Sequence, residues 1–179
     1  MRKNTKNITY GSVIAALYVI LTYLQNFLFP NSASAAIQFR ASEALCVLAF
    51  FTPVAIPGLS VGCFLFNISN AAALPLDFLV GTAATALSAT GMYLTRKITI
   101  KGFPLLGLLI PAVCNGILVG AVLAWQQTGF GDAFLPAFLF NGGSVALGEA
   151  AVCFILGLVL LRTMEQTPYF RDLSSRREK

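Results

Sequence analysis

Basic residues divide this chain into long apolar segments. Eleven of its twelve Lys and Arg residues lie in three groups, at positions 2–6, 96–101 and 162–179. The segments between these groups carry very few charges. Since Lys and Arg accumulate in the cytoplasmic loops beside membrane spans, the pattern predicts a multi-pass membrane protein and also its orientation. The twelfth basic residue, Arg40, lies away from the three groups and is the first candidate for a functional role.

The composition excludes an ordinary soluble protein. The 179 residues are 57% hydrophobic and 11% charged, whereas soluble domains have roughly 25% charged residues. No polar stretch is long enough for a second domain, so residues 1–179 are expected to form one integral-membrane domain. The positive-inside pattern accounts for the net charge of +5. We therefore expect no nucleic-acid partner, and we expect the basic ends to lie against lipid headgroups.

The chain lacks the side chains that most catalytic and metal sites use. It has no histidine, which is the commonest metal ligand and general base. Its four cysteines all lie inside apolar runs without a CxxC pair, which is typical of small buried side chains. We expect no metal, no cofactor and no enzymatic activity. The cysteines are Cys46, Cys63, Cys114 and Cys153.

The apolar runs predict an all-α membrane protein. A helical span needs about 20 mainly apolar residues. Pro53, Pro57 and Gly58 separate the second run from the third. The first run exceeds the apolar core of a signal peptide, about 7–15 residues, so we expect it to be retained as a span. The prediction is a six-transmembrane-helix bundle with both termini cytoplasmic and only Arg40 among the basic residues outside. Its spans cover about 8–29, 41–55, 57–73, 76–94, 104–125 and 137–161.

Several polar residues are predicted to lie at membrane depth, mainly in the outer half of the bundle. A charge in mid-bilayer costs about 2.5–3.5 kcal/mol on insertion scales, so such residues normally face a partner or a cavity. Structural roles are open for most of them: an ion pair, a helix cap or hydrogen bonds between helices. Glu149, deep in the last span with no basic residue nearby in sequence, is the strongest candidate for binding. The set comprises Arg40, Glu43, Asn67, Asn70, Asp77, Asn115, Asn141 and Glu149.

Small residues mark a second surface near the cytoplasmic end of the first span. Gly11 with Ala15 and Ser12 with Ala16 form two small-xxx-small pairs, which allow another helix to approach closely. These pairs serve either internal packing or the docking of a membrane partner. Trp125 is either part of an interfacial aromatic belt or the wall of a pocket.

Five segments together resemble the QueT family, whose members are predicted queuosine-precursor binding subunits (S-components) of energy-coupling factor (ECF) transporters. The most specific segment is FRASEAL at 39–45. The others are AALYVILT at 15–22, GL at 58–59 continuing through GC at 62–63 to Asn67, PLD at 75–77 followed by GT at 81–82, and GE at 148–149. The resemblance covers nearly the whole chain.

The resemblance implies a subunit of the bacterial cell membrane that binds a small molecule from outside. It would dock on an EcfT-type transmembrane coupling subunit that carries two cytoplasmic ATPases. S-components often use an AxxxA motif for this contact, and here Gly11, Ser12, Ala15 and Ala16 would form an altered version of it. The chain has no GxxxxGK[ST] motif, which agrees with an ATPase on a separate chain.

The implied substrate is a 7-deazaguanine such as preQ1, or queuine. Glu149 would accept the two adjacent N–H groups of its guanine-like edge, and Asn67, Asn70 and Asn141 would read other ring atoms. Asp77 or Glu43 would receive an aminomethyl cation, Phe39 and Trp125 would stack on the ring, and Arg40 would hold Glu43. The alternatives are an S-component for another vitamin or nucleobase and an autonomous carrier. Little polarity in the inner half disfavours a carrier, and the lack of histidine and of GxSxG disfavours an intramembrane enzyme.

Overall fold

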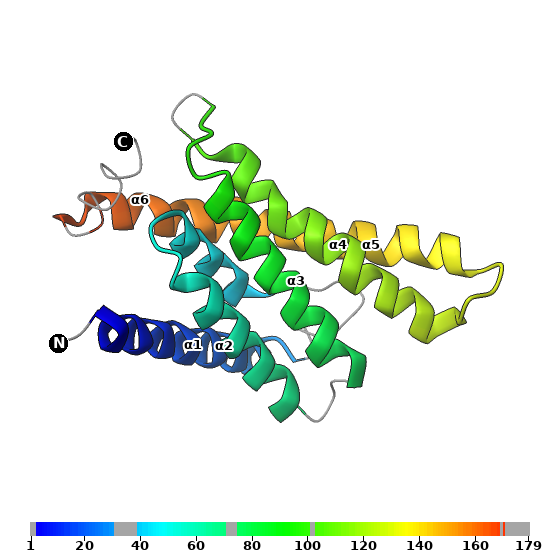
Figure 1. Ribbon diagram of the computed structural model, residues 1–179. Helices are drawn as coiled ribbons and strands as arrows, with labels where there is room; N and C mark the ends of the chain where they lie inside the picture. Colours follow the sequence, from blue (N-terminus) through cyan, green and yellow to red (C-terminus); the bar gives the residue numbers. More distant parts are fainter. Residues whose placement is uncertain (1–2, 31–38, 71–74, 101–102, 169, 171–179) are drawn as a thin grey trace.

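A computed structural model describes residues 3–30, 39–70, 75–100, 103–168 and 170. Its regular structure is helical, which confirms the all-α class. Successive helices pack against one another, and the last three form one continuous helix over 134–166 (Figure 1). The elements are α1 Lys3–Leu28, η1 Ala41–Phe50, α2 Ala55–Ser69, α3 Pro75–Leu94, α4 Leu105–Thr128, α5 Phe134–Val152, η2 Cys153–Gly157 and α6 Leu158–Gln166.

Each predicted span contains a helix. Among the described residues, three helices are long and apolar enough to cross a membrane: 4–28 within α1, α4, and the continuous helix over 134–166. The apolar helices at 41–50, 55–69 and 78–94 are shorter. The first turn of α1 and the last turn of α6 lie on the left in Figure 1, and the connection from α4 to α5 lies on the right. This arrangement is compatible with six spans and cytoplasmic termini, both of which stay predictions.

Two helix ends differ from the predicted span limits, and the span limits themselves stay predictions. The second span was expected to continue to residue 55, but η1 ends at Phe50 and α2 begins at Ala55. Pro57 therefore does not break a helix; it lies in the first turn of α2, where its missing N–H has no helical partner to lose. The last span was expected to end at residue 161, but the helix continues to Gln166 because polar residues that favour helices follow the apolar run.

The helix η1 is a 3₁₀ helix at the centre of the bundle. Eight of its ten residues are buried, and it packs against α1, α2, α3 and η2. A 3₁₀ helix has three residues per turn, so side chains three positions apart lie above one another. Arg40, Glu43 and Cys46 therefore share one side of η1, and Val47 and Phe50 belong to the apolar core.

Glycines fix the relative positions of the long helices. A Cβ at Gly62 of α2 would lie 2.7 Å from the Cβ of Tyr18, and one at Gly58 would lie 2.8 Å from the carbonyl oxygen of Gly11, so α1 and α2 run parallel. On the other side of the bundle, Gly120 of α4 meets the backbone of Gly142 of α5, since a Cβ there would lie 2.5 Å from the Gly142 Cα. No side chain larger than hydrogen fits between these backbones.

Candidate functional site

Glu43 is the centre of a buried hydrogen-bond network. Its Oε1 accepts hydrogen bonds from the Tyr18 hydroxyl at 2.6 Å and from Thr85 Oγ1 at 2.7 Å. Its Oε2 accepts one from Cys46 Sγ at 3.1 Å. The side chain is fully buried. One carboxylate thus joins α1, η1 and α3, and hydrogen bonds to a charged group contribute about 1.5–3 kcal/mol each.

A polar stripe on α1 holds the start of η1. Thr22 Oγ1 lies 2.7 Å from Ser42 Oγ. The side-chain amide of Gln25 donates to the Phe39 carbonyl and accepts from the Ala41 N–H. Sequence reasoning missed these residues, although Tyr18, Thr22 and Gln25 follow the i, i+4, i+7 spacing of one helix face. That spacing was the available signal.

Arg40 and Asn67, two of the predicted site residues, lie close together beside this network. Both donate weak hydrogen bonds to Cys63 Sγ, Arg40 at 3.6 Å and Asn67 at 3.5 Å. Gly81 of α3 leaves room for them, because a Cβ there would lie 3.0 Å from Asn67 Nδ2 and 3.7 Å from Arg40 Nη1. Arg40, Glu43 and Asn67 therefore belong to one buried cluster.

Arg40 lies just before η1, near Glu43 and Glu149, the two acidic side chains that are buried in the described part of the chain. Its guanidinium interacts electrostatically with the side chains of Tyr18, Cys63, Glu43 and Glu149. Among these neighbours, the carboxyl groups are Glu43 and Glu149. An arginine side chain keeps its charge in proteins, so it attracts both carboxyl groups.

Four buried polar atoms have no hydrogen-bond partner within the described parts of the chain. They are Asn115 Nδ2 on α4, Asn141 Oδ1 and Glu149 Oε2 on α5, and Ser88 Oγ on α3, which does lie close to the Cys114 side chain. An unsatisfied buried group costs about 1–3 kcal/mol, and hydrocarbon around the bundle offers no substitute. Native proteins retain few such groups, so four on three adjacent helices require a physical explanation.

Helix packing places three of these residues, Ser88, Asn115 and Glu149, at similar levels along the axis of the bundle. On α4, Asn115 lies next to Gly116. Gly116 packs against Ala146 of α5, and Ala146 lies about one turn before Glu149. Gly91 of α3 contacts Ile110 of α4, which places Ser88 near the height of Asn115 in the antiparallel pair. Asn141 lies eight residues before Glu149, about 12 Å along α5, and its Nδ2 donates to Gln127 Oε1 at 2.9 Å.

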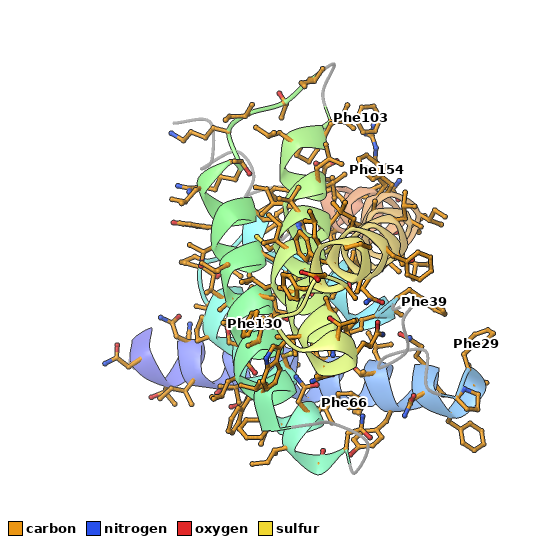
Figure 2. The ribbon with its side chains drawn as sticks, turned by 90° about the vertical axis from the view of Figure 1, so that its right-hand side faces the viewer. Phe29, Phe39, Phe66, Phe103, Phe130 and Phe154 are labelled. Atoms are coloured by element: carbon orange, nitrogen blue, oxygen red, sulfur yellow. The ribbon has the colours of Figure 1, made fainter. Side chains whose placement is uncertain are left out.

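The remaining predicted residues lie around or away from this cluster. Phe39 is half-buried, and its ring meets that of Phe29 edge-on at 6.0 Å between centroids (Figure 2). Asn70 is half-buried at the end of α2. Trp125 is 40% exposed, packs against Phe130, and lies about 15 Å along α4 from Asn115, so the structure does not bring it to the cluster. The side chain of Asp77 is outside the described residues.

The predicted docking residues divide between two faces of α1. Ala15 is buried and Gly11 half-buried, and both face α2, since the backbone of Ala15 contacts Gly62 and that of Gly11 contacts Gly58. Ser12 and Ala16 are exposed. A groove of about 530 Å³ lies beside them between α1 and α2. Its walls comprise Asn7, Ile8, Gly11, Ser12, Ala15, Pro53, Val54, Pro57, Gly58 and Val61.

Comparison with known proteins assigns the family. The sequence model of the QueT transporter family matches residues 8–166, which is most of the chain and covers the described helices apart from the first five residues of α1. No curated protein and no solved structure matches it. The match confirms the resemblance carried by the FRASEAL segment and the segments around it. The chain therefore belongs to the QueT transporter family.

Proposed function

We propose that this protein is the substrate-binding membrane subunit of an ECF-type importer and captures a queuosine precursor from the extracellular side. The substrate is a 7-deazaguanine such as preQ1, or queuine. Membership of a transporter family and three helices long enough to span a membrane support transport across the bacterial cell membrane. The observation that carries the proposal is the set of buried, unpartnered polar atoms on α3, α4 and α5.

The unpartnered atoms complement the edge of a guanine-like ring. That edge offers two neighbouring N–H donors and one carbonyl acceptor. Glu149 supplies an acceptor at Oε2, and the Nδ2 of Asn115 supplies a donor at a similar height in the bundle. A ligand held by Glu149 and Asn115 would remove the cost of burying both groups. Ser88, and Asn141 about 12 Å along α5 from Glu149, are the further polar groups that we assign to the ring substituents.

Transport requires partners that this chain does not supply. An EcfT-type coupling subunit with two cytoplasmic ATPases fits the family resemblance. The exposed pair Ser12 and Ala16, with the groove beside it, is the surface we assign to that contact. Small residues there allow a partner helix to approach closely. The side of α1 that carries Gly11 and Ala15 is used for packing on α2.

The proposal predicts tight ligand binding by the purified protein without ATP or partners. Isothermal titration calorimetry with preQ1 should show saturable binding, and Glu149→Gln should weaken it by about 10- to 150-fold, because the amide removes one charge-assisted hydrogen bond. Glu165→Gln is the matched control, since Glu165 lies on α6 in an exposed ion pair with Arg162 at 3.9 Å. Glu165→Gln should bind as the wild type does.

Three results would change the assignment. Unaltered affinity in a folded Glu149→Gln protein would remove Glu149 from the site. Binding of another vitamin or nucleobase, with no response to 7-deazaguanines, would indicate an S-component of different specificity. Ligand flux through vesicles containing this chain alone would indicate an autonomous carrier.

A further inference from the structure

An exposed glutamine contacts a buried asparagine near the connection from α4 to α5. Gln127 lies in the last turn of α4 and is exposed, whereas Asn141 of α5 is 1% exposed. Asn141 Nδ2 donates a hydrogen bond to Gln127 Oε1 at 2.9 Å. The distribution of basic residues predicts that this end of the bundle, on the right in Figure 1, is the extracellular one. The pair therefore lies where a ligand from outside would enter.

The contact leaves one end of the Asn141 amide for another molecule. Asn141 Oδ1 is buried and has no hydrogen-bond partner among the described residues. Turning both amides over does not satisfy Asn141, because Gln127 would then donate to Oδ1 and leave Asn141 Nδ2 unpaired. The second amide group of Gln127 is exposed, so it can be hydrated at little cost. Gln127 thus determines whether Asn141 presents an acceptor or a donor.

Asn141 is placed to meet a ring substituent. Glu149, which the proposed function assigns to the ring edge, lies about 12 Å further along the same continuous helix. A bicyclic ring held by Glu149, with its substituted side toward the extracellular end, extends toward Asn141. An oxygen of Asn141 facing that substituent needs a donor, since two facing acceptors would both stay unpaired.

We propose that Gln127 is a positioning residue. By accepting a hydrogen bond from Asn141 Nδ2, it holds the Asn141 oxygen toward the ligand. The site then selects a 7-deazaguanine whose 7-substituent donates a hydrogen bond over one whose substituent only accepts. This rests on the proposed function and adds a residue outside the buried cluster, one that does not touch the ligand. Because the selection depends on hydrogen-bond direction and not on charge, two neutral substituents are enough to reveal it.

The test compares two neutral ligands by calorimetry. The hydroxyl of 7-hydroxymethyl-7-deazaguanine can donate, whereas the aldehyde of 7-formyl-7-deazaguanine only accepts. The wild type should bind the hydroxymethyl ligand about tenfold more tightly, the effect of one hydrogen bond. Gln127→Glu, whose carboxylate only accepts, should keep this preference. Gln127→Lys, whose ammonium only donates, should turn the Asn141 amide over and reverse it. Gln127→Met removes the contact and should bring the ratio of affinities close to one.

Unsubstituted 7-deazaguanine is the control ligand. Its affinity should be the same in all four proteins, which shows that they are folded and that the ring site is intact. Equal effects of all three substitutions on the ratio would indicate a merely structural role for Gln127 and overturn the inference. A wild type without preference, or with a preference for the formyl ligand, would overturn it and leave the proposed function standing. Binding of none of the three ligands would overturn both. If Gln127→Lys did not fold, the contrast between Gln127→Glu and Gln127→Met would still decide.

Discussion

Tyr18→Phe isolates the contribution of one hydroxyl to the stability of the bundle. The phenol ring is fully buried, and its hydroxyl donates to Glu43 Oε1 at 2.6 Å. Phenylalanine keeps the ring and its packing against Gly62. The change removes one hydrogen bond to a carboxylate, so the free energy of unfolding should fall by about 1.5–3 kcal/mol. Thr85 still donates to the same oxygen, which keeps the loss near the lower end of this range.

Tyr23→Phe is a matched control on the same helix. The Tyr23 hydroxyl also makes a short hydrogen bond, to Ser69 Oγ at 2.7 Å, but both groups are exposed and uncharged. Its loss should cost about 1 kcal/mol or less, because water or headgroups replace the partner. The assay is reversible denaturant titration of both variants in the same mild detergent, followed by tryptophan fluorescence of Trp125, the single tryptophan.

Two results of this comparison would contradict the reasoning. If Tyr18→Phe cost no more than Tyr23→Phe, the Tyr18 hydroxyl would not hold a buried carboxylate, and the network around Glu43 would be incorrectly assigned. A loss well above 3 kcal/mol would also contradict the reasoning, since it would mean that the ring had moved as well. Ligand affinity measured on the same samples separates effects on the site from effects on the fold.

Two further predictions use matched neighbours. Gly120→Ala should destabilise the protein by about 1–3 kcal/mol or more in the same titration, because the new Cβ would lie 2.5 Å from Gly142 Cα. Gly143→Ala, where the Cβ meets nothing within 4 Å, should be neutral or slightly stabilising, and equal effects would reject the close packing of α4 on α5. Ala16→Trp, on the exposed face of α1, should leave ligand binding intact and reduce uptake by cells that contain the whole transporter; unimpaired uptake would reject this face as the docking surface. Ala15→Trp should instead lower stability, since Ala15 is buried against α2.

Helix positions were predictable because one physical rule dominates them. Apolar runs of sufficient length, ended by charges, Pro or Gly, must form helices in a bilayer, where backbone groups find no water. The starts of α3 and α4 fall within one residue of the predicted spans. This rule does not say where a helix ends once it has left the membrane. The extension of α6 to Gln166 could therefore not be predicted from it.

The candidate site was predictable in part. Arg40, Glu43 and Asn67 stand out in the sequence because polar groups at membrane depth need a reason, and the structure places them together. Thr85 and Ser88 were missed because hydroxyl groups are tolerated in spans through bonds to their own helix. Only the packing of α3 on its neighbours distinguishes Thr85, whose hydroxyl binds Glu43, from Ser88, whose hydroxyl lies close to Cys114.

The 3₁₀ conformation of η1 could not be predicted from the sequence. It is also the feature that most affects the buried cluster of Arg40, Glu43 and Asn67. In an α-helix, side chains three and six positions apart are turned by about 60° and about 120° around the axis, so Arg40 and Cys46 would lie on different sides. The 3₁₀ form brings both closer to the row of Glu43, which accepts a hydrogen bond from Cys46. Ten residues of 3₁₀ helix are unfavourable by themselves, so the donors from α1 and α3 must stabilise this form.

Val47 of η1 contacts Gly157 of the π-helical η2, which follows the helix that carries Glu149. Two irregular windings thus pack against each other beside the two buried carboxyl groups, which is the arrangement expected where tertiary contacts, and not local propensity, determine the backbone.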